Sequence, residues 1–427
     1  MSILIFFVFS LFFLLFFWRT PTSSAAAIDD LREKIDDRNN KIAEIEKEIA
    51  AYQKQIDATG KEAKSLQGAI QTLNLERKRL LSEIDVTQNK IESVTYNLEE
   101  IVIDIKNKEA KIDNNTKALK KSIRDIDQMD SISFIEKMLT YESVSEVLAH
   151  VDSIEQFQSS VNEKLEELEI LKMELLQKKE ENEKKRGELI NLKEEYTDKK
   201  QLTEQQKKDK DKLLADTKNK EANYKKILEE KKRLKEEFEQ ELFEFESKLR
   251  LEIDPQSIPP AGKGILKWPL DSILVTQHFG QTDFSRANSS VYNGKGHNGV
   301  DFRAARGTRI KAALSGTVSG IGNTDVQSGC YSYGKWVLID HANGLSTLYA
   351  HLDLIKVKAG ESVVTGDIIG YSGNTGYSTG PHLHFGVYAT QGVKIVRFGD
   401  VRPKTNCSNV QLPVADLRAY LNPLLYL

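Results

Sequence analysis

IDDLREKIDDRNNKIAEIEKEIAAYQKQI, residues 28–56, carries isoleucine at every seventh position. The series of apolar residues continues with this spacing to Ile126, and only Arg77 interrupts it with a charge. A second apolar series, three residues further along, includes Leu31 and Ile45. Because two apolar residues in every seven keep one face of a helix against a partner, this repeat predicts a long left-handed coiled coil.

A looser apolar series from Ile154 to Phe245 predicts a second helical arm. Each arm would have about 100 residues and extend roughly 150 Å at the rise of an α-helix. Arms of similar length favour an antiparallel hairpin, in which each arm buries the apolar stripe of the other. Self-association of parallel arms in a dimer is the alternative, and the sequence leaves the choice open.

The two arms are separated by a tip segment near residues 131–153. This segment is richer in apolar residues than a solvated turn requires, and includes Phe134, Ile135, Met138, Leu139 and Tyr141. Two interpretations stay open: a short helix that caps the hairpin, or a docking surface for a partner protein.

Residues 1–27 have the composition of an export segment. The sixteen residues from Ile3 to Trp18 are apolar except for Ser10, and small residues follow at 23–27. A short apolar run followed by small residues is typical of a cleaved signal peptide. An uncleaved membrane anchor is the alternative, although no Lys or Arg precedes the run. Both interpretations put the rest of the chain outside the cytoplasm. It would lie in the cell wall or the periplasm, or be anchored in the membrane and face outward.

Composition changes abruptly near Asp254. Of the nine prolines, none lies between Pro21 and Pro255, so residues 28–253 suit a coiled-coil region. Residues 254–264 are rich in Pro and Gly and predict a linker. From residue 265 to 427, short β-prone runs alternate with glycine turns, which predicts a mainly antiparallel β domain. The formal net charge is −3 with both signs interspersed, which gives no indication of nucleic-acid binding.

Four histidines and one aspartate of the β domain have a spacing that suits a metal centre. His297 and Asp301 are four residues apart, His382 and His384 are two apart, and His351 lies between these pairs. Residues two apart on a strand point to the same side, so His382 and His384 are expected to face one cavity. Imidazole and carboxylate groups are zinc ligands, and a catalytic site uses three of them and leaves one position for water.

These motifs resemble the LytM/lysostaphin-type zinc endopeptidases of peptidoglycan. The resemblance covers about residue 265 to the end of the chain. It rests on GHNGVDF at 296–302, TLYAHL at 347–352, GYSGNTGYSTGPHLHF at 370–385 and NPLLYL at 422–427. It implies one zinc ion per domain, bound by His297, Asp301 and His384, and no other cofactor. It further implies that His351 and His382 are the catalytic histidines beside the bound water.

The front half resembles the coiled-coil regions of EnvC-like and PcsB-like division hydrolases. That resemblance implies a role in cell division or wall remodelling, regulated through the coil, and an FtsEX-like membrane complex as a partner at the tip. It also supplies an alternative function, because EnvC-like proteins have lost metal ligands and activate a cell-wall amidase without being enzymes. The complete set of five residues favours an active peptidase that cleaves peptidoglycan cross-links, although the bond cleaved is not revealed.

The chain contains two cysteines, Cys330 and Cys407, in two loops that depart from the family pattern, residues 323–332 and 394–413. An even number of cysteines in an exported chain suggests a disulfide, and two unrelated buried thiols are the alternative. The remaining histidines, His150, His278 and His341, are expected to have structural roles only.

Overall fold

The computed structural model describes residues 24–59, 65–130, 144–254, 256, 258–281, 286 and 296–427. The chain divides into two compact units, residues 1–43 with 87–195, and residues 44–86 with 196–427. Residues 1–23 of the predicted export segment and residues 131–143 of the predicted tip segment lie outside the described residues. Among the helices that are described, none is long and apolar enough to cross a membrane.

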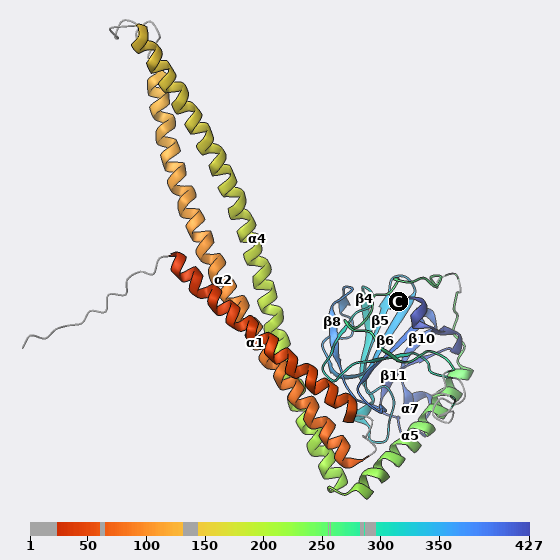
Figure 1. Ribbon diagram of the computed structural model, residues 1–427. Helices are drawn as coiled ribbons and strands as arrows, with labels where there is room; N and C mark the ends of the chain where they lie inside the picture. Colours follow the sequence, from red (N-terminus) through yellow and green to blue (C-terminus); the bar gives the residue numbers. More distant parts are fainter. Residues whose placement is uncertain are drawn as a thin grey trace, which may run out of the picture. The chain divides into compact units, whose positions relative to one another are not determined.

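Long helices form the front of the chain, and an antiparallel β domain follows, as predicted. Helix α2 (Leu66–Asp130) and helix α4 (Val144–Thr217) run side by side in opposite directions (Figure 1). In the first unit, the ion pair of Lys108 with Glu174 joins the two helices. The antiparallel hairpin is therefore the arrangement that this chain adopts.

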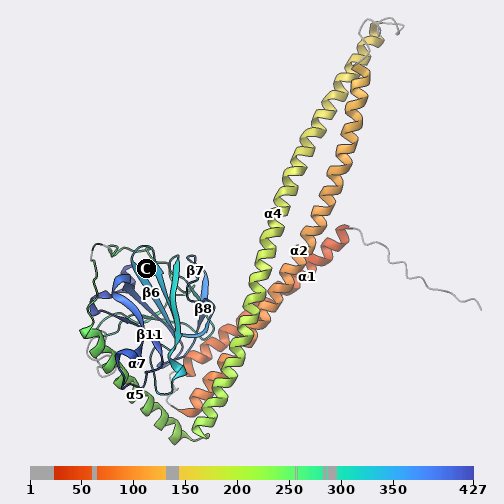
Figure 2. The same cartoon turned by 180° about the vertical axis from the view of Figure 1, so that it is seen from behind.

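The same antiparallel register holds within the second unit. The Nζ of Lys210 on α4 lies 2.7 Å from the Oδ1 of Asn74 on α2. Leu80 of α2 and Leu202 of α4 are both fully buried and belong to one apolar cluster. Figure 2, which views the molecule from behind, shows the same two helices beside each other.

The predicted first arm is divided into two helices. Helix α1 (Ser24–Thr59) ends before α2 begins, and it runs antiparallel to α2, with Arg32 paired to Glu100 at 2.8 Å. The sequence between the helices contains Gly60, whose backbone freedom makes helix formation unfavourable by about 1 kcal/mol relative to Ala. The continuous seam from Ile28 to Ile126 therefore belongs to two helices that fold back on each other.

The predicted second arm is also divided, and its last part leaves the coil. Helix α4 ends at Thr217, where Lys218 and Asn219 have φ angles of 49° and 55°. Helix α5 (Glu221–Lys248) then packs on the β domain (Figure 1). Its Phe238 and Leu242 are buried, and the Phe238 ring lies 5.3 Å from the Phe398 ring. The apolar stripe of α5 thus serves the core of the domain and not the coil.

One antiparallel sheet organises the β domain. Ten strands of the described residues belong to it, with the central order β1-β2-β9-β6-β5-β4-β7; β12 pairs with β9, and β8 pairs with both β6 and β3. The strands are β1 (Val275–Gln277), β2 (Val300–Arg303), β3 (Arg309–Lys311), β4 (Gly316–Asn323), β5 (Lys335–His341), β6 (Leu345–Ile355), β7 (Ser362–Val363), β8 (Ile368–Ser372), β9 (His382–Ala389) and β12 (Tyr420–Leu421). A separate hairpin pairs β10 (Val393–Arg397) with β11 (Gln411–Ala415).

Both faces of the sheet are buried at its central strands β5, β6 and β9, where nearly every residue is buried. Successive residues of β5 belong to different clusters: Val337 joins one core, whereas Trp336 and Leu338 join the other. Helix α5 contributes Phe238 and Leu242 to this second core. The domain core consequently includes residues that precede the predicted linker.

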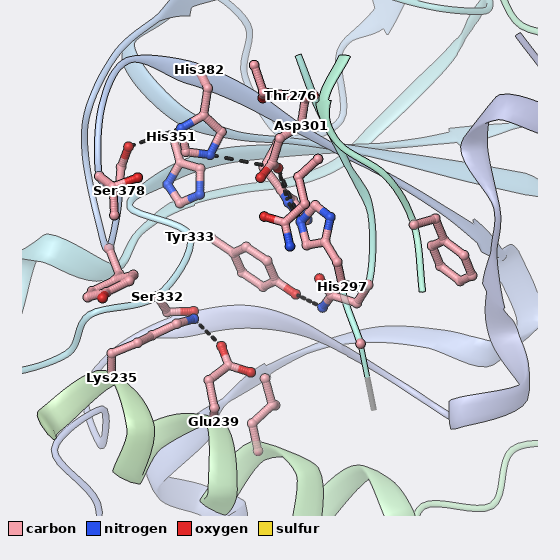
Figure 3. Close-up of a pocket in the computed structure, with 18 of the residues that line it drawn as sticks. Lys235, Glu239, Thr276, His297, Asp301, Ser332, Tyr333, His351, Ser378 and His382 are labelled. Carbon is pink, nitrogen blue, oxygen red and sulfur yellow. Dashed lines mark hydrogen bonds and ion pairs between the residues drawn. The ribbon is translucent and has the colours of Figure 1, made fainter. Parts of the chain in front are cut away.

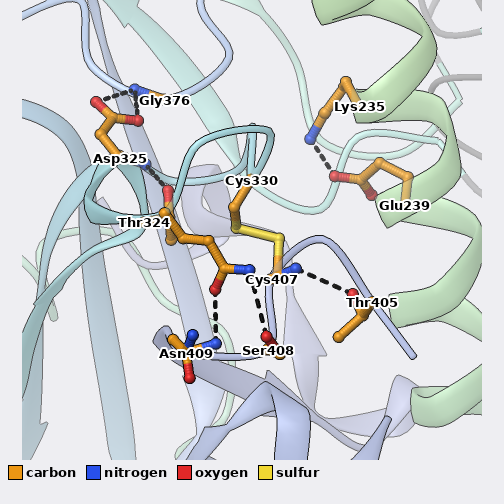
Figure 4. The surroundings of a disulfide bond; sticks show 12 residues. Lys235, Glu239, Thr324, Asp325, Cys330, Gly376, Thr405, Cys407, Ser408 and Asn409 are labelled. Atoms are coloured by element: carbon orange, nitrogen blue, oxygen red, sulfur yellow. Dashed lines mark hydrogen bonds and ion pairs between the residues drawn. A yellow bond between two sulfur atoms is a disulfide. The ribbon is translucent and has the colours of Figure 1, made fainter. Parts of the chain in front are cut away.

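The disulfide expected between the two extra loops is present. Cys330 and Cys407 are bonded, with Cα atoms 4.8 Å apart (Figure 4). Gln327 adds two hydrogen bonds between the same loops, because its side chain donates to the Ser408 hydroxyl and accepts from the Asn409 amide. The loops therefore form one cross-linked unit beside β4 and β10.

Candidate metal centre

Strands β2 and β9 bring two of the predicted ligands, Asp301 and His384, together. Asp301 of β2 pairs directly with His384 of β9, and Arg303 pairs with His382. Side chains that are directly opposite on antiparallel strands have Cβ atoms about 5 Å apart, which is within reach of a shared ligand. The two-residue spacing of His382 and His384 turns both toward the same pocket, as expected.

His297 reaches the same place through a tight crossing of two loops. Its backbone N–H and C=O both pair with Gly280, at 2.9 and 2.7 Å. Gly296 beside it has a φ of 89°, and a Cβ there would lie 2.4 Å from the Gly280 carbonyl carbon. Only glycine fits this approach, which explains the residue before His297 in the motif.

Three potential ligand atoms converge in the structure. The Oδ1 of Asp301 lies 3.0 Å from His384 Nδ1 and 3.2 Å from His297 Nε2, and the two nitrogens are 3.1 Å apart. Tetrahedral zinc with bonds of about 2.0–2.1 Å separates its ligand atoms by roughly 3.3 Å. The three residues therefore fit a single zinc-sized cation, both in spacing and in chemistry.

The backbone carbonyl of His278 orients the ring of His297. Its Nδ1 lies 3.2 Å from the carbonyl oxygen of His278, so the ring donates its proton there and keeps the Nε2 lone pair for a ligand. His384 is turned the other way, with Nδ1 toward Asp301. Its Nε2 is buried and has no hydrogen-bond partner among the described residues. A Cβ on Gly299 would lie 2.8 Å from that nitrogen, so glycine is needed to leave the ring its space.

His351 and His382 lie beside this cluster, with ring centres 4.6 Å apart. His351 donates its Nδ1 proton to the carbonyl oxygen of Thr375 at 2.8 Å, and His382 does the same to Gly380 at 2.8 Å. Each ring consequently keeps its Nε2 as an acceptor on the side away from its carbonyl. The Nε2 of His382 is 3.7 Å from Asp301 Oδ1. Both rings are thus in the tautomer that lets Nε2 accept a proton.

Burial and the neighbouring charges determine the protonation of the cluster. Burial alone would raise the pKa of Asp301, but the imidazoles of His297 and His384 beside the carboxylate hold that pKa well below its usual range. Burial lowers the pKa of His384, and burial together with the neighbouring His382 and His384 lowers the pKa of His351 further. The carboxylate is therefore charged and these two imidazoles are neutral at pH 7.

The pocket at the centre is bounded by more than the motif residues (Figure 3). All five predicted residues line it, so the structure brings the complete predicted set together. Tyr333 lines it too, and its hydroxyl accepts a hydrogen bond from Asn298 at 3.2 Å. One wall is helix α5, through these residues: Lys235, Glu239, Leu242, Phe243 and Glu246.

Helix α5 is the part of the site that sequence reasoning missed. Its heptad-like spacing indicated coiled coil, and no motif marks its residues as part of a pocket. In Figure 3, Lys235 and Glu239 lie on the opposite side of Tyr333 from His351 and His382. The His278 carbonyl was also missed, because a backbone acceptor leaves no trace in the sequence.

Residues 295–396 match Peptidase family M23. Over 117 residues the chain is 37% identical to the "DD-carboxypeptidase/endopeptidase Mpg" of Neisseria meningitidis, which is 27% of this chain and 25% of that protein. It is 44% identical over 96 residues to lysostaphin of Staphylococcus simulans (22% and 18% of the two chains). It is 43% identical over 90 residues to the peptidoglycan DD-endopeptidase ShyA of Vibrio cholerae (21% and 19%).

A solved structure of the lysostaphin catalytic domain from Staphylococcus simulans is 34% identical, with a TM-score of 0.24, over 28% of this chain and 81% of that one. The chain spans about a quarter or less of the length of the curated relatives named above. The match to the family model, at residues 295–396, lies within the β domain.

Proposed function

Because residues 295–396 form a Peptidase family M23 domain homologous to lysostaphin and ShyA, we propose that this chain is a zinc-dependent peptidoglycan endopeptidase. The observation that carries the proposal is the convergence of two imidazole nitrogens and one carboxylate oxygen within 3.0–3.2 Å of one another. His297, Asp301 and His384 would hold the metal ion. Bound there, zinc would polarise the scissile carbonyl and acidify a water molecule.

The chain's own residues would perform the proton transfers. His351 and His382 each donate Nδ1–H to a backbone carbonyl, which leaves Nε2 on the side of the ring away from that carbonyl. One of them would accept the proton of the attacking water, and the other, once protonated, would donate to the developing oxyanion or the leaving amine. His351 and Tyr333 are both buried, and low exposure to solvent would strengthen these interactions.

The substrate would be the peptide part of the cell wall, and the site of action would be outside the cytoplasm. The names of two relatives support this substrate, since ShyA is a peptidoglycan DD-endopeptidase and Mpg a DD-carboxypeptidase/endopeptidase. The disulfide between Cys330 and Cys407 agrees with an oxidising compartment. The apolar segment from Ile3 to Trp18 would serve as the signal peptide or membrane anchor.

Digestion of purified peptidoglycan tests the proposal. The full chain is incubated with cross-linked muropeptides, with and without a zinc chelator, and the products are identified by mass spectrometry. We expect chelator-sensitive loss of cross-linked dimers, and the mass of the new termini identifies the cleaved bond. A zinc-loaded chain that leaves every cross-link intact, but increases the activity of a cell-wall amidase, would favour the alternative of a non-enzymatic activator.

Regulation through the helical region belongs to the proposal as well. The supporting observation is that α5, an extension of the coil in sequence, lines one wall of the pocket. A signal that reaches the helices would change the pocket only if a partner binds two states of the helices with different affinities. We propose an FtsEX-like membrane complex acting at the tip as that partner, in cell division or wall remodelling.

A further inference from the structure

His351 has a backbone conformation that its surroundings must impose. Its φ is 60°, one of three positive values among the described non-glycine residues. The pairing of β5 with β6 shifts register at this point, so that Ala350 and His351 together face the single residue Trp336. A non-glycine residue in the left-handed region costs about 1–3 kcal/mol and persists only where the neighbouring structure holds it.

The side chain of His351 is held by a loop at residues 373–376. Its Nδ1 donates a hydrogen bond to the backbone carbonyl of Thr375. The hydroxyl of Thr375 donates to the Leu352 carbonyl at 2.9 Å and accepts from the Lys335 amide at 3.0 Å, which ties this loop to β5 and β6. The position of the loop therefore determines where the His351 ring points.

Asp353 braces the other end of the same loop. It is the extra residue at a second register shift, where β6 pairs with β8. Its Oδ1 accepts from the Asn374 amide at 3.4 Å, and a Cβ on Gly373 would lie 2.2 Å from that oxygen. Glycine at 373 thus lets the loop approach a carboxylate that lies two residues from His351.

Arg306 fixes the Asp353 carboxylate with two hydrogen bonds. Its Nε lies 2.7 Å from Oδ2 and its Nη2 lies 3.0 Å from Oδ1, and both side chains are 5% exposed or less. Two parallel bonds between guanidinium and carboxylate define direction as well as distance. Such a buried pair is a rigid support for the loop above it.

Within the second unit, helices α2 and α4 place two further carboxylates beside Arg306. The Nη2 of Arg306 also contacts Asp209 on α4, and its Nη1 lies 3.8 Å from Glu76 Oε2 on α2. The backbone carbonyl of Arg306 accepts from the guanidinium of Arg79 on α2. Arg306 therefore contacts both helices, α2 and α4, and also Asp353, the carboxylate that supports the 373–376 loop.

We propose that Asp353 and Arg306 are positioning residues for His351, and that the α2 and α4 carboxylates of the coil complete their arrangement. The inference rests on the proposed function in that it assigns His351 to the reaction. Loss of the brace would let the 373–376 loop shift, and the Thr375 carbonyl would no longer orient the His351 ring. Displacing or removing residues that orient a reacting group typically lowers activity about tenfold to a hundredfold.

The test compares Asp353→Asn and Arg306→Lys in the full chain with a matched control, Asp198→Asn. Asp198 on α4 also forms an ion pair with the β domain, to Lys356 at 2.9 Å, and accepts a hydrogen bond from the Tyr371 hydroxyl, but among the described residues no hydrogen bond joins it to the 373–376 loop. We expect Asp353→Asn to lower kcat on soluble cross-linked muropeptides by about tenfold or more, with KM and bound zinc unchanged. Asp198→Asn should retain the wild-type kcat, and Arg306→Lys, which keeps the charge but loses the paired hydrogen bonds, should retain only part of it.

A second readout does not depend on activity. In ¹⁵N spectra of the histidine side chains, wild-type His351 should give a signal for a hydrogen-bonded Nδ1–H, which Asp353→Asn alters and Asp198→Asn leaves unchanged. An unaltered signal and kcat in Asp353→Asn would overturn the inference. An altered signal in a chain whose wild type hydrolyses nothing would support the positioning and refute the proposed function. If Asp353→Asn does not fold, Asp209→Asn, which removes a partly exposed coil carboxylate, should show the same signature more weakly.

Discussion

Asp301 and His384 face each other across strands β2 and β9, with Oδ1 3.0 Å from Nδ1. They are 83 residues apart in sequence, yet their strands are neighbours in the sheet. His297 Nε2 lies 3.2 Å from the same carboxylate oxygen. The ligand set thus depends on two adjacent strands and one loop.

Removing any of the three proposed ligands should remove the zinc. His297→Ala, Asp301→Ala and His384→Ala each delete one of three protein ligands, so purified variants should contain almost no zinc by elemental analysis. His351→Ala and His382→Ala should keep the metal and lose hydrolysis by about a hundredfold to ten-thousandfold, because they remove proton-transfer groups. Zinc loss in His351→Ala together with zinc retention in His384→Ala would show that the ligand assignment is wrong.

The disulfide should contribute strongly to the stability of the β domain. In the chain-entropy model, closing a loop of this length stabilises the folded state by about 4 kcal/mol. We expect the double variant Cys330→Ala/Cys407→Ala to unfold at a lower temperature than the wild type under oxidising conditions. Peptide mapping of the exported protein without reductant is the control, and two free thiols in that protein would contradict the prediction.

The buried carboxyl of Glu246 on α5 should make stability depend on pH. Burial raises its pKa from 4.5 to about 8, although it accepts bonds from the Tyr420 hydroxyl and the Ala415 amide. Between pH 4.5 and about 8, the Glu246 carboxyl keeps its proton in the folded chain and releases it in the unfolded chain. The contribution of Glu246 is therefore complete below pH 4.5 and is lost as the pH rises toward 8, by about 1.4 kcal/mol per unit.

Glu246→Gln should flatten this decline, as measured by thermal unfolding at pH 5 to 8 with tryptophan fluorescence. Glu244→Gln on the same helix is the matched control. Bonds from Gln240 and Arg402 lower the pKa of Glu244, so its stabilisation is lost only as the pH falls below 4.5. Equal pH dependence in Glu246→Gln and the wild type would show that the carboxyl is ionised in the folded chain.

If α5 restrains the peptidase, trimming its pocket-facing side chains should accelerate hydrolysis. Lys235→Ala/Glu239→Ala shortens two side chains that line the pocket and leaves the buried anchors Phe238 and Leu242 in place. We expect kcat/KM on muropeptides to rise roughly threefold to tenfold, which corresponds to about 1 kcal/mol in the barrier.

The matched control for α5 is Arg233→Ala/Glu237→Ala, an exposed ion pair on the same helix with the same spacing. Equal rates in both double variants would identify α5 as a passive wall, and a slower rate in Lys235→Ala/Glu239→Ala would make these side chains substrate contacts. The comparison uses the full chain, because deleting the residues before 265 would uncover the core that Phe238 and Leu242 fill.

In the helical region, local sequence patterns predict the helices but not the surfaces against which they pack. The heptads correctly predicted long helices, because apolar periodicity is a property of the local sequence. They did not separate α1 from α2, nor α4 from α5, because each helix has the same kind of stripe. Whether such a stripe packs on another helix, as Leu80 does on α4, or on a sheet, as Phe238 does, depends on which surface the folded chain brings near it.

The candidate site divides in the same way. The sequence singled out the five polar residues of the site, since a His-x-His spacing on a strand has a direct steric meaning and the resemblance implied the other members. Only the tertiary structure decided that Arg306 supports Asp353, that the Thr375 carbonyl orients His351, and that α5 lines the pocket. These contacts join residues far apart in sequence through backbone groups and buried charges, and their geometry is set when the sheet, loops and helices pack together.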